Sequence, residues 1–113
     1  MKGIKGKVIA ISSSKGGVGK TIFATNLAGV YHHLKMKVLL IDMDLSCGGV
    51  NVMLNVDSDK TIYNLADDIL NNRFKEASDY VYHYSEYVDI LSSCKDPRQA
   101  SKIDMKILML QLI

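Results

Sequence analysis

The order of apolar and polar residues along the chain predicts alternating strands and helices. Apolar runs at 7–12 and 38–42 are continuous, as expected for parallel strands that are covered on both faces. Between them, over residues 20–35, apolar side chains recur every three or four positions and predict a helix whose stripe packs on the sheet: Phe23, Leu27, Val30, Tyr31 and Leu34. A strand, a helix and a second strand in this order predict a right-handed crossover and a parallel sheet.

The second half of the chain continues the pattern less regularly. A helix is expected to begin near residue 61, capped by Asp59 or Thr61, with four apolar residues on one face: Ile62, Leu65, Ile69 and Leu70. Residues 74–84 predict a further helix and 87–92 a third strand. Pro97 can start a helix at its tolerated first position, and residues 101–113 enter the next helix. The tyrosines at 80, 82, 84 and 87 are interpreted as packing residues at the sheet edge, rather than as a platform on which bases stack.

A loop rich in glycine lies between the first strand and the first helix, with the sequence Ser12-Ser13-Ser14-Lys15-Gly16-Gly17-Val18-Gly19-Lys20-Thr21. Three glycines in four positions let successive backbone N–H groups turn inward, and the helix that follows adds its positive N-terminal end. This loop predicts a phosphate site, in which Lys20 binds the β- and γ-phosphates and the Thr21 hydroxyl binds Mg²⁺. The residues expected to bind the nucleotide are Lys15, Gly16, Gly17, Val18, Gly19, Lys20, Thr21 and Ile22.

Two aspartates, Asp42 and Asp44, end the second strand. Ligands of open α/β sheets bind at the carboxyl ends of the strands, so both carboxylates are expected near the phosphates. Hydrolysis of a phosphoanhydride needs a metal that neutralises charge and a group that orients the attacking water, and two carboxylates can divide these roles. The alternative is that both aspartates only solvate a turn.

The motif K-G-G-x-G-K-T at residues 15–21 resembles the deviant P-loop of the MinD/ParA family of dimerising ATPases. The resemblance implies a three-layer α/β P-loop NTPase fold with a mainly parallel sheet, and ATP and Mg²⁺ as ligands. It also implies that Lys15 reaches phosphates bound by a partner subunit, that Asp42 belongs with Thr21 to the magnesium neighbourhood, and that Asp44 positions the water. Lys15, Lys20 and Asp44 would then be the catalytic residues, in a homodimer that encloses the nucleotides.

Residues after the aspartates resemble one branch of this family in particular. Gly48, the segment 50–54 and the segment 59–65 are most similar to the pilus-assembly branch of the TadZ/CpaE type, although flagellar-number, septum-site and partition ATPases share this layout. Residues 45–54 are expected to form a moving loop beside the nucleotide. The resemblance implies an ATPase that dimerises on nucleotide and, with a protein partner, positions a pilus or secretion apparatus, a septum, a flagellum, or a chromosome or plasmid. A localisation scaffold that binds ATP without hydrolysing it, and an inactive fragment, are the alternatives.

The composition restricts the class of protein, its compartment and its surfaces. The chain has 113 residues, 48% hydrophobic and 23% charged, with a formal net charge of +2, which favours one globular unit and no nucleic-acid or membrane surface. No apolar run is long enough for a signal peptide or a membrane span, so a cytoplasmic protein is expected, recruited to a membrane or pole only by other parts or partners. Cys47 and Cys94 are isolated and are interpreted as buried or idle thiols. Residues 1–113 are expected to be the N-terminal portion of one truncated ATPase domain, inactive in isolation.

Overall fold

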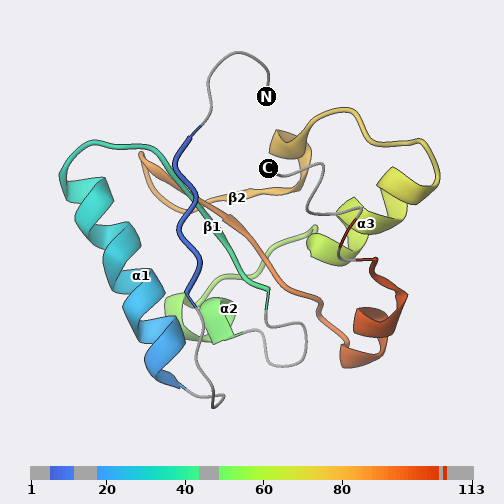
Figure 1. Ribbon diagram of the computed structural model, residues 1–113, viewed down its shortest axis with the longest axis horizontal. Coiled ribbons are helices and arrows are strands. Elements are labelled where there is room, and N and C mark those ends of the chain that lie inside the picture. The colour runs from blue at the N-terminus through green and yellow to red at the C-terminus, as the bar shows by residue number, and fades with distance from the viewer. Residues whose placement is uncertain (1–5, 12–17, 44–48, 105, 107–113) are drawn as a thin grey trace.

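The computed structural model describes residues 6–11, 18–43, 49–104 and 106. In chain order its elements are α1 (Val18–His33), β1 (Val38–Ile41), α2 (Gly49–Leu54), α3 (Ile62–Leu70), the 3₁₀ helix η1 (Ala77–Tyr80), β2 (Tyr82–His83), β3 (Val88–Leu91) and the 3₁₀ helix η2 (Pro97–Lys102). A central sheet separates α1 and α2 from α3 (Figure 1). Within the described residues, each helix is too short or too polar to span a membrane.

The sheet has the strand order β1-β3-β2. β1 and β3 are parallel, with Val38 opposite Val88 and Ile41 opposite Leu91, whereas β2 is antiparallel to β3. The predicted strands at 38–42 and 87–92 are therefore confirmed within a residue or two of their ends. Because β2 and β3 are joined by a tight hairpin, their pairing has to be antiparallel.

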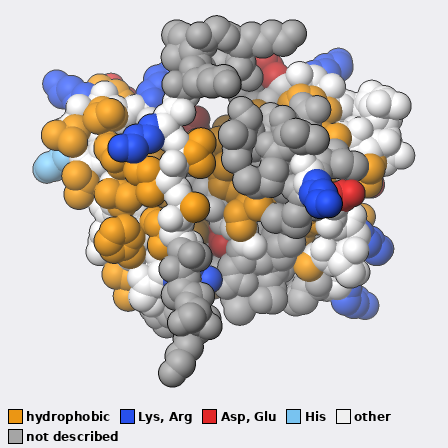
Figure 2. All heavy atoms as spheres, in the orientation of Figure 1, with side chains coloured by type: hydrophobic (Ala, Val, Ile, Leu, Met, Phe, Trp, Pro, Cys, Tyr) orange, Lys and Arg blue, Asp and Glu red, His pale blue; other side chains and the backbone are white. Residues whose placement is uncertain are grey.

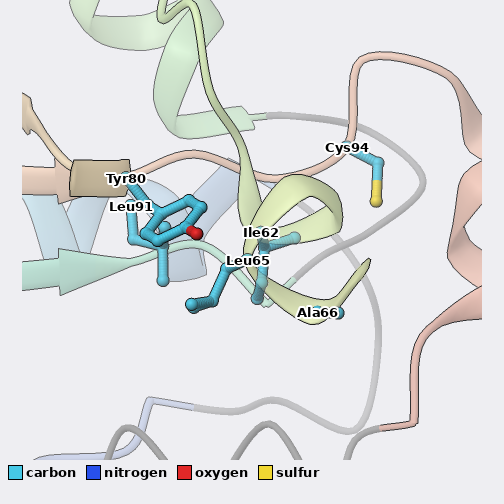
Figure 3. Packing of buried hydrophobic residues seen from close by; sticks show 6 residues of the cluster. All are labelled: Ile62, Leu65, Ala66, Tyr80, Leu91 and Cys94. Atoms are coloured by element: carbon cyan, nitrogen blue, oxygen red, sulfur yellow. The ribbon is translucent and has the colours of Figure 1, made fainter. Parts of the chain in front are cut away.

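Side chains alternate between the two faces of the sheet, and each face has its own core. One face packs against α1 and α2 through Ala28, Val38, Leu40, Val50, Val88 and Ile90. The other face packs against α3 through Ile41, Ile62, Leu65, Ala66 and Leu91, most of which are labelled in Figure 3. Two helical layers around one sheet confirm the predicted three-layer α/β class.

Helix α3 begins with a capping box. The Thr61 side chain accepts a hydrogen bond from the Tyr63 N–H at 3.2 Å, and the Asn64 Oδ1 accepts one from the Thr61 N–H at 2.8 Å. Of the two caps that the sequence allows, Thr61 is therefore the one used. The predicted apolar face is only partly buried, because Ile62 and Leu65 are enclosed whereas Leu70 is exposed at the end of the helix.

A polar cluster ties η1 to α3. The Tyr80 hydroxyl donates a 2.5 Å hydrogen bond to Asp68, which also accepts from Arg73 at 3.0 Å. The hydrogen bond from Tyr80, together with Arg73, lowers the pKa of Asp68 below its usual value. Burial, followed by the contact with Asp68, raises the pKa of Tyr80 to about 12. The loop between these elements is thus closed by hydrogen bonds that also hold Tyr80 in the core.

The predicted strand at 7–12 is wrong for residues 7–11, which the structure describes and which form no strand. A groove of about 470 Å³ separates this segment from β1, and both segments line it, together with apolar side chains of α1. In the described sheet β1 pairs with β3 alone, so residues 7–11 have the composition of a strand but no ladder with β1. Residue 12 lies outside the described residues.

The predicted apolar stripe of α1 also needs correction. Helix α1 spans 18–33, close to the predicted range, but Phe23, Val30 and Leu34 are 59%, 54% and 62% exposed. The small residue Ala28 is instead buried in the core with residues of the sheet, while Leu27 and Tyr31 are half-buried. Helix α1 is apolar on more than one side, and Figure 2 shows apolar side chains gathered over its part of the surface. Spacing alone therefore could not identify the buried face.

The predicted helix at 74–84 is wrong. Its residues form η1 and then β2, which pairs with β3. Tyr80, Tyr82 and Tyr84 alternate along the chain, and alternation is a strand pattern. Of these, Tyr80 is buried while the other two are exposed at the edge of the sheet, so the expected packing role is confirmed for Tyr80. The predicted start of a helix at Pro97 is confirmed as the 3₁₀ helix η2. Of the last predicted helix, at 101–113, residues 101–102 belong to η2, residues 103–104 form no helix, and residues 105 and 107–113 lie outside the described residues.

Candidate functional site

Buried polar side chains gather where the strands of the sheet end. They are Asp42, Ser58, Thr61, Ser92 and Ser93. Asp42 directly follows β1, and its N–H continues the ladder by donating to the Leu91 carbonyl at 3.1 Å. The Asp42 side chain is only 6% exposed, which is unusual for a carboxylate that has no structural or binding role. Among the described residues, buried polar side chains are thus concentrated at the carboxyl edge of the sheet.

The described part of the predicted phosphate loop forms the beginning of α1. The backbone of Val18 starts the helix, Gly19 and Ile22 are exposed, and Lys20 and Thr21 are half-buried in its first turns. The first N–H groups of a helix have no partner within the helix and carry its positive end, so this position suits an anion. Of the predicted site residues, Lys15, Gly16, Gly17 and Asp44 lie outside the described residues.

Both predicted magnesium ligands contact the beginning of helix α2. The Val50 N–H donates a hydrogen bond of 3.3 Å to the Asp42 Oδ2. At the preceding residue, Gly49, a β-carbon would lie 3.0 Å from the Thr21 Oγ1, so Thr21 packs directly against the backbone there. Asp42 and Thr21 therefore contact adjacent residues at the beginning of one helix, although they come from β1 and α1.

The segment 45–54 was expected to be a moving loop, and its described part, residues 49–54, is the helix α2. Contacts on two sides hold this helix. The Thr25 hydroxyl of α1 lies 3.3 Å from the Met53 sulfur, and Val50 is buried in the core beneath the sheet. Residues 44–48 lie outside the described residues.

The chemistry of this arrangement suits magnesium and phosphate. A threonine hydroxyl and an aspartate carboxylate supply the hard oxygen ligands that Mg²⁺ prefers, and Mg²⁺ usually takes only one or two protein ligands beside water and phosphates. Thr21 lies in the first turn of α1, where phosphate oxygens would also meet free N–H groups. The residues present therefore fit a magnesium-bound nucleotide.

Sequence reasoning missed part of this site. Gly49 and Val50 position the predicted ligands, and Asn51 and Ser92 are hydrogen-bonded behind them at 2.8 Å. Ser92 could have been found, because it follows β3 at the same edge as Asp42 follows β1, and the rule for strand ends applies to both. The role of Gly49 depends on a contact with α1 that no local pattern encodes.

Cys94 lies near this edge but behaves as a packing residue. It is buried against α3, and burial raises the pKa of its thiol, which disfavours the reactive thiolate. The interpretation of Cys94 as a buried thiol is confirmed, whereas Cys47 lies outside the described residues.

The sequence profile of a family described as AAA domain matches residues 6–110, nearly the whole chain. The chain belongs to this family. The matched range includes both the beginning of α1 and Asp42, so the AAA domain carries the complete candidate site.

Similarity to curated relatives identifies the family more narrowly. The septum site-determining protein MinD of Thermotoga maritima is 31% identical over 111 residues, covering 96% of this chain and 40% of that protein. The chromosome partitioning protein ParA of Myxococcus xanthus is 38% identical over 68 residues, covering 60% of this chain and 24% of that protein. An ATP-binding protein of Methanocaldococcus jannaschii is 38% identical over 106 residues, covering 93% of this chain and 38% of that protein. These relatives identify the AAA domain as one of the MinD/ParA-type P-loop ATPases.

The matches to the MinD and ATP-binding relatives cover nearly all of this chain but less than half of each relative. The chain spans about two fifths of the MinD and ATP-binding relatives, at 40% and 38% of their lengths.

Proposed function

We propose that this chain carries the phosphate and magnesium half of a MinD/ParA-like ATPase, which binds ATP with Mg²⁺, dimerises on nucleotide and hydrolyses it. The observation that supports this most is the convergence of Thr21 and Asp42 on the first two residues of α2. Thr21 and Asp42 are 21 positions apart in sequence, and a turn of solvated aspartates would give no reason for the burial of Asp42.

Each residue has a separate task in this proposal. The N–H groups at the beginning of α1 bind phosphate oxygens, and Lys20 adds a charge for the β- and γ-phosphates. Thr21 and Asp42 hold Mg²⁺, which neutralises charge that develops on the transferred phosphoryl group. Asp44, one residue beyond the described part of the β1 edge, orients the attacking water. Lys15 contacts the phosphates of the partner subunit.

We expect Lys15→Ala to separate binding from turnover. If Lys15 acts across a dimer interface, the variant retains ATP affinity as a monomer and loses turnover by at least about tenfold, since one charge-assisted contact to the transferred phosphate is removed. Phosphate release measured against protein concentration tests this, with calorimetric ATP affinity as the control. Unchanged turnover at high protein concentration would refute the role across the interface.

We expect Gly49→Ala to reduce the increase in ATP affinity that Mg²⁺ causes. The new methyl would lie 3.0 Å from the Thr21 Oγ1 and so displaces either Thr21 or the beginning of α2. The gain in ATP affinity on adding Mg²⁺ should fall by about tenfold, the usual scale for a disturbed metal surrounding. Calorimetric titrations with and without Mg²⁺ measure this gain.

Gly29→Ala is the matched control for this substitution. Gly29 lies within α1, and a β-carbon there meets nothing within 4 Å. The variant should keep the full magnesium dependence and raise the free energy of unfolding by about 0.5–1 kcal/mol, because alanine is the better helix former. Equal loss of magnesium dependence in both variants would contradict the role of Gly49.

The test of the proposed function combines phosphate release with sedimentation analysis. Magnesium-dependent phosphate release and an ATP-dependent dimer would support the full proposal. An ATP-dependent dimer without phosphate release would instead support a localisation scaffold that uses ATP as a structural ligand. The same assays on a longer polypeptide that includes this chain distinguish an inactive fragment from an inactive family member.

The cellular role follows from the relatives' names and is proposed on that basis. MinD is named for septum-site determination and ParA for chromosome partitioning, so a role in positioning a cellular assembly fits both. Within this class we favour the pilus-assembly branch of the TadZ/CpaE type, because residues 48–65 resemble it. A cytoplasmic protein that a partner recruits to a membrane or pole completes the proposal.

A further inference from the structure

Three polar side chains form an ordered hydrogen-bond network behind the candidate site. The Ser92 hydroxyl donates to the Asn51 Oδ1 at 2.8 Å, and the Ser58 and Ser92 hydroxyl oxygens are 2.8 Å apart. A serine hydroxyl has one proton, and Ser92 gives its proton to the amide oxygen. Ser58 must therefore be the donor to Ser92, which fixes the direction of the whole network from Ser58 through Ser92 to Asn51.

This network joins three separate parts of the fold. Ser92 directly follows β3, Ser58 lies in the connection between α2 and α3, and Asn51 is the third residue of α2. Ser92 is 0% exposed and Ser58 is 3% exposed, so water cannot replace the hydrogen bonds if one partner is lost. The network therefore fixes α2 against the end of β3.

Helix α2 needs such an anchor. With six residues it is far shorter than a helix that is stable by itself in water. Of its apolar side chains, Val50 is buried, while Val52 is 79% exposed. Val50 and the partly buried Leu54 pack in the core, and the hydrogen bond at Asn51 adds a polar attachment between them.

The anchored residue is next to the two residues that contact the predicted magnesium ligands. Asn51 follows Val50, whose N–H binds Asp42, and Gly49, whose backbone packs against Thr21. A shift of α2 at Asn51 would therefore move both contacts together.

We propose that the network of Ser58, Ser92 and Asn51 positions α2 and thereby sets how strongly Mg²⁺ is bound with the nucleotide. This inference rests on the proposed function, and it assigns Ser92 and Asn51 as positioning residues that touch neither the metal nor the phosphates. Groups behind metal ligands typically change metal affinity by about 10–100-fold when they are removed.

Ser93 provides a matched control one residue away. It is also buried, at 1% exposure, yet its hydroxyl oxygen has no hydrogen-bond partner among the described residues. Ser92→Ala leaves the Asn51 oxygen without its donor and Ser58 without its acceptor, whereas Ser93→Ala removes a hydroxyl that forms no hydrogen bond within the described part of the chain. The two variants make the same chemical change at neighbouring buried positions with opposite consequences for the network.

The experiment measures ATP affinity with Mg²⁺ and with EDTA for the wild type, Ser92→Ala, Asn51→Ala and Ser93→Ala, alongside thermal unfolding without nucleotide. We expect the gain from Mg²⁺ to fall about tenfold in Ser92→Ala and Asn51→Ala, and to stay at the wild-type value in Ser93→Ala. Asn51→Ala keeps the test valid if Ser92→Ala does not fold, because alanine favours helix and Asn51 is only half-buried.

The outcomes are distinguishable. If Ser92→Ala or Asn51→Ala unfolds at a lower temperature but keeps the full gain from Mg²⁺, the network is only structural and the inference is wrong. The inference would also fail if Ser93→Ala lost the gain as strongly as Ser92→Ala. A wild type that gains nothing from Mg²⁺ would overturn the proposed function as well as this inference.

Discussion

A Lys20→Ala variant is expected to lose ATP binding, with affinity reduced on the order of a hundredfold or more. Lys20 is half-buried in the first turn of α1, next to Thr21 and close to the free N–H groups of the helix. Among the described residues, no carboxylate forms an ion pair with Lys20, so its charge is not neutralised by the described part of the fold. Removing the ammonium group takes away the charged hydrogen bonds that the phosphates would receive.

Lys37→Ala is the control for this prediction. Lys37 is exposed before β1, so its loss changes the net charge by the same amount without touching the beginning of α1. We expect the affinity of Lys37→Ala for ATP to match that of the wild type. Titration calorimetry with Mg²⁺ compares the three proteins. Wild-type affinity in a folded Lys20→Ala variant would refute the assignment of the phosphate site.

Leu65→Ala is expected to have the largest effect on stability, lowering the free energy of unfolding by about 2–5 kcal/mol. Leu65 is 0% exposed and lies at the centre of the core between α3 and the sheet, beside Ile62, Tyr80 and Leu91 (Figure 3). Truncation leaves a cavity that the surrounding core side chains cannot easily fill. Domains of this size are stable by only about 5–15 kcal/mol in total, so the variant loses a large share of its stability.

Leu70→Ala tests the same chemical change in the same helix. Leu70 is 52% exposed at the end of α3, so its truncation should cost less than about 1 kcal/mol. Urea unfolding followed by circular dichroism gives both values. Similar losses in the two variants would show that the core of the structure is not centred on Leu65.

The sequence predicted those elements whose signal is local. β1 was recognisable as a short apolar run ending in Asp42, and α3 as an apolar pattern preceded by a capping residue. The segment 74–84 was wrongly predicted as a helix because Ala77 and Val81 complete a spacing of three or four residues. Its tyrosines at 80, 82 and 84 alternate instead, as in a strand. Residues 7–11 have the composition of a strand, but in the described sheet β1 pairs with β3 alone, and composition does not show whether a segment finds a partner strand.

In the candidate site, too, some residues were predictable from the sequence and others were not. Thr21 and Asp42 were predictable because each follows from a rule that links sequence to position, the helix beginning for Thr21 and the strand end for Asp42. Helix α2 was not predicted, because six residues are too few to show a period and Gly49 looked like part of a flexible turn. Its contacts with Thr21 and Asp42 arise only when α1, β1 and α2 are assembled.

Calorimetric titration of ATP into this 113-residue chain, with Mg²⁺ and with EDTA, tests the proposed phosphate and magnesium site itself. We expect binding that strengthens when Mg²⁺ is present, because Thr21 and Asp42 contact adjacent residues at the beginning of α2. ATP binding that is absent, or that is the same with and without Mg²⁺, in a chain shown by circular dichroism to be folded would contradict the account.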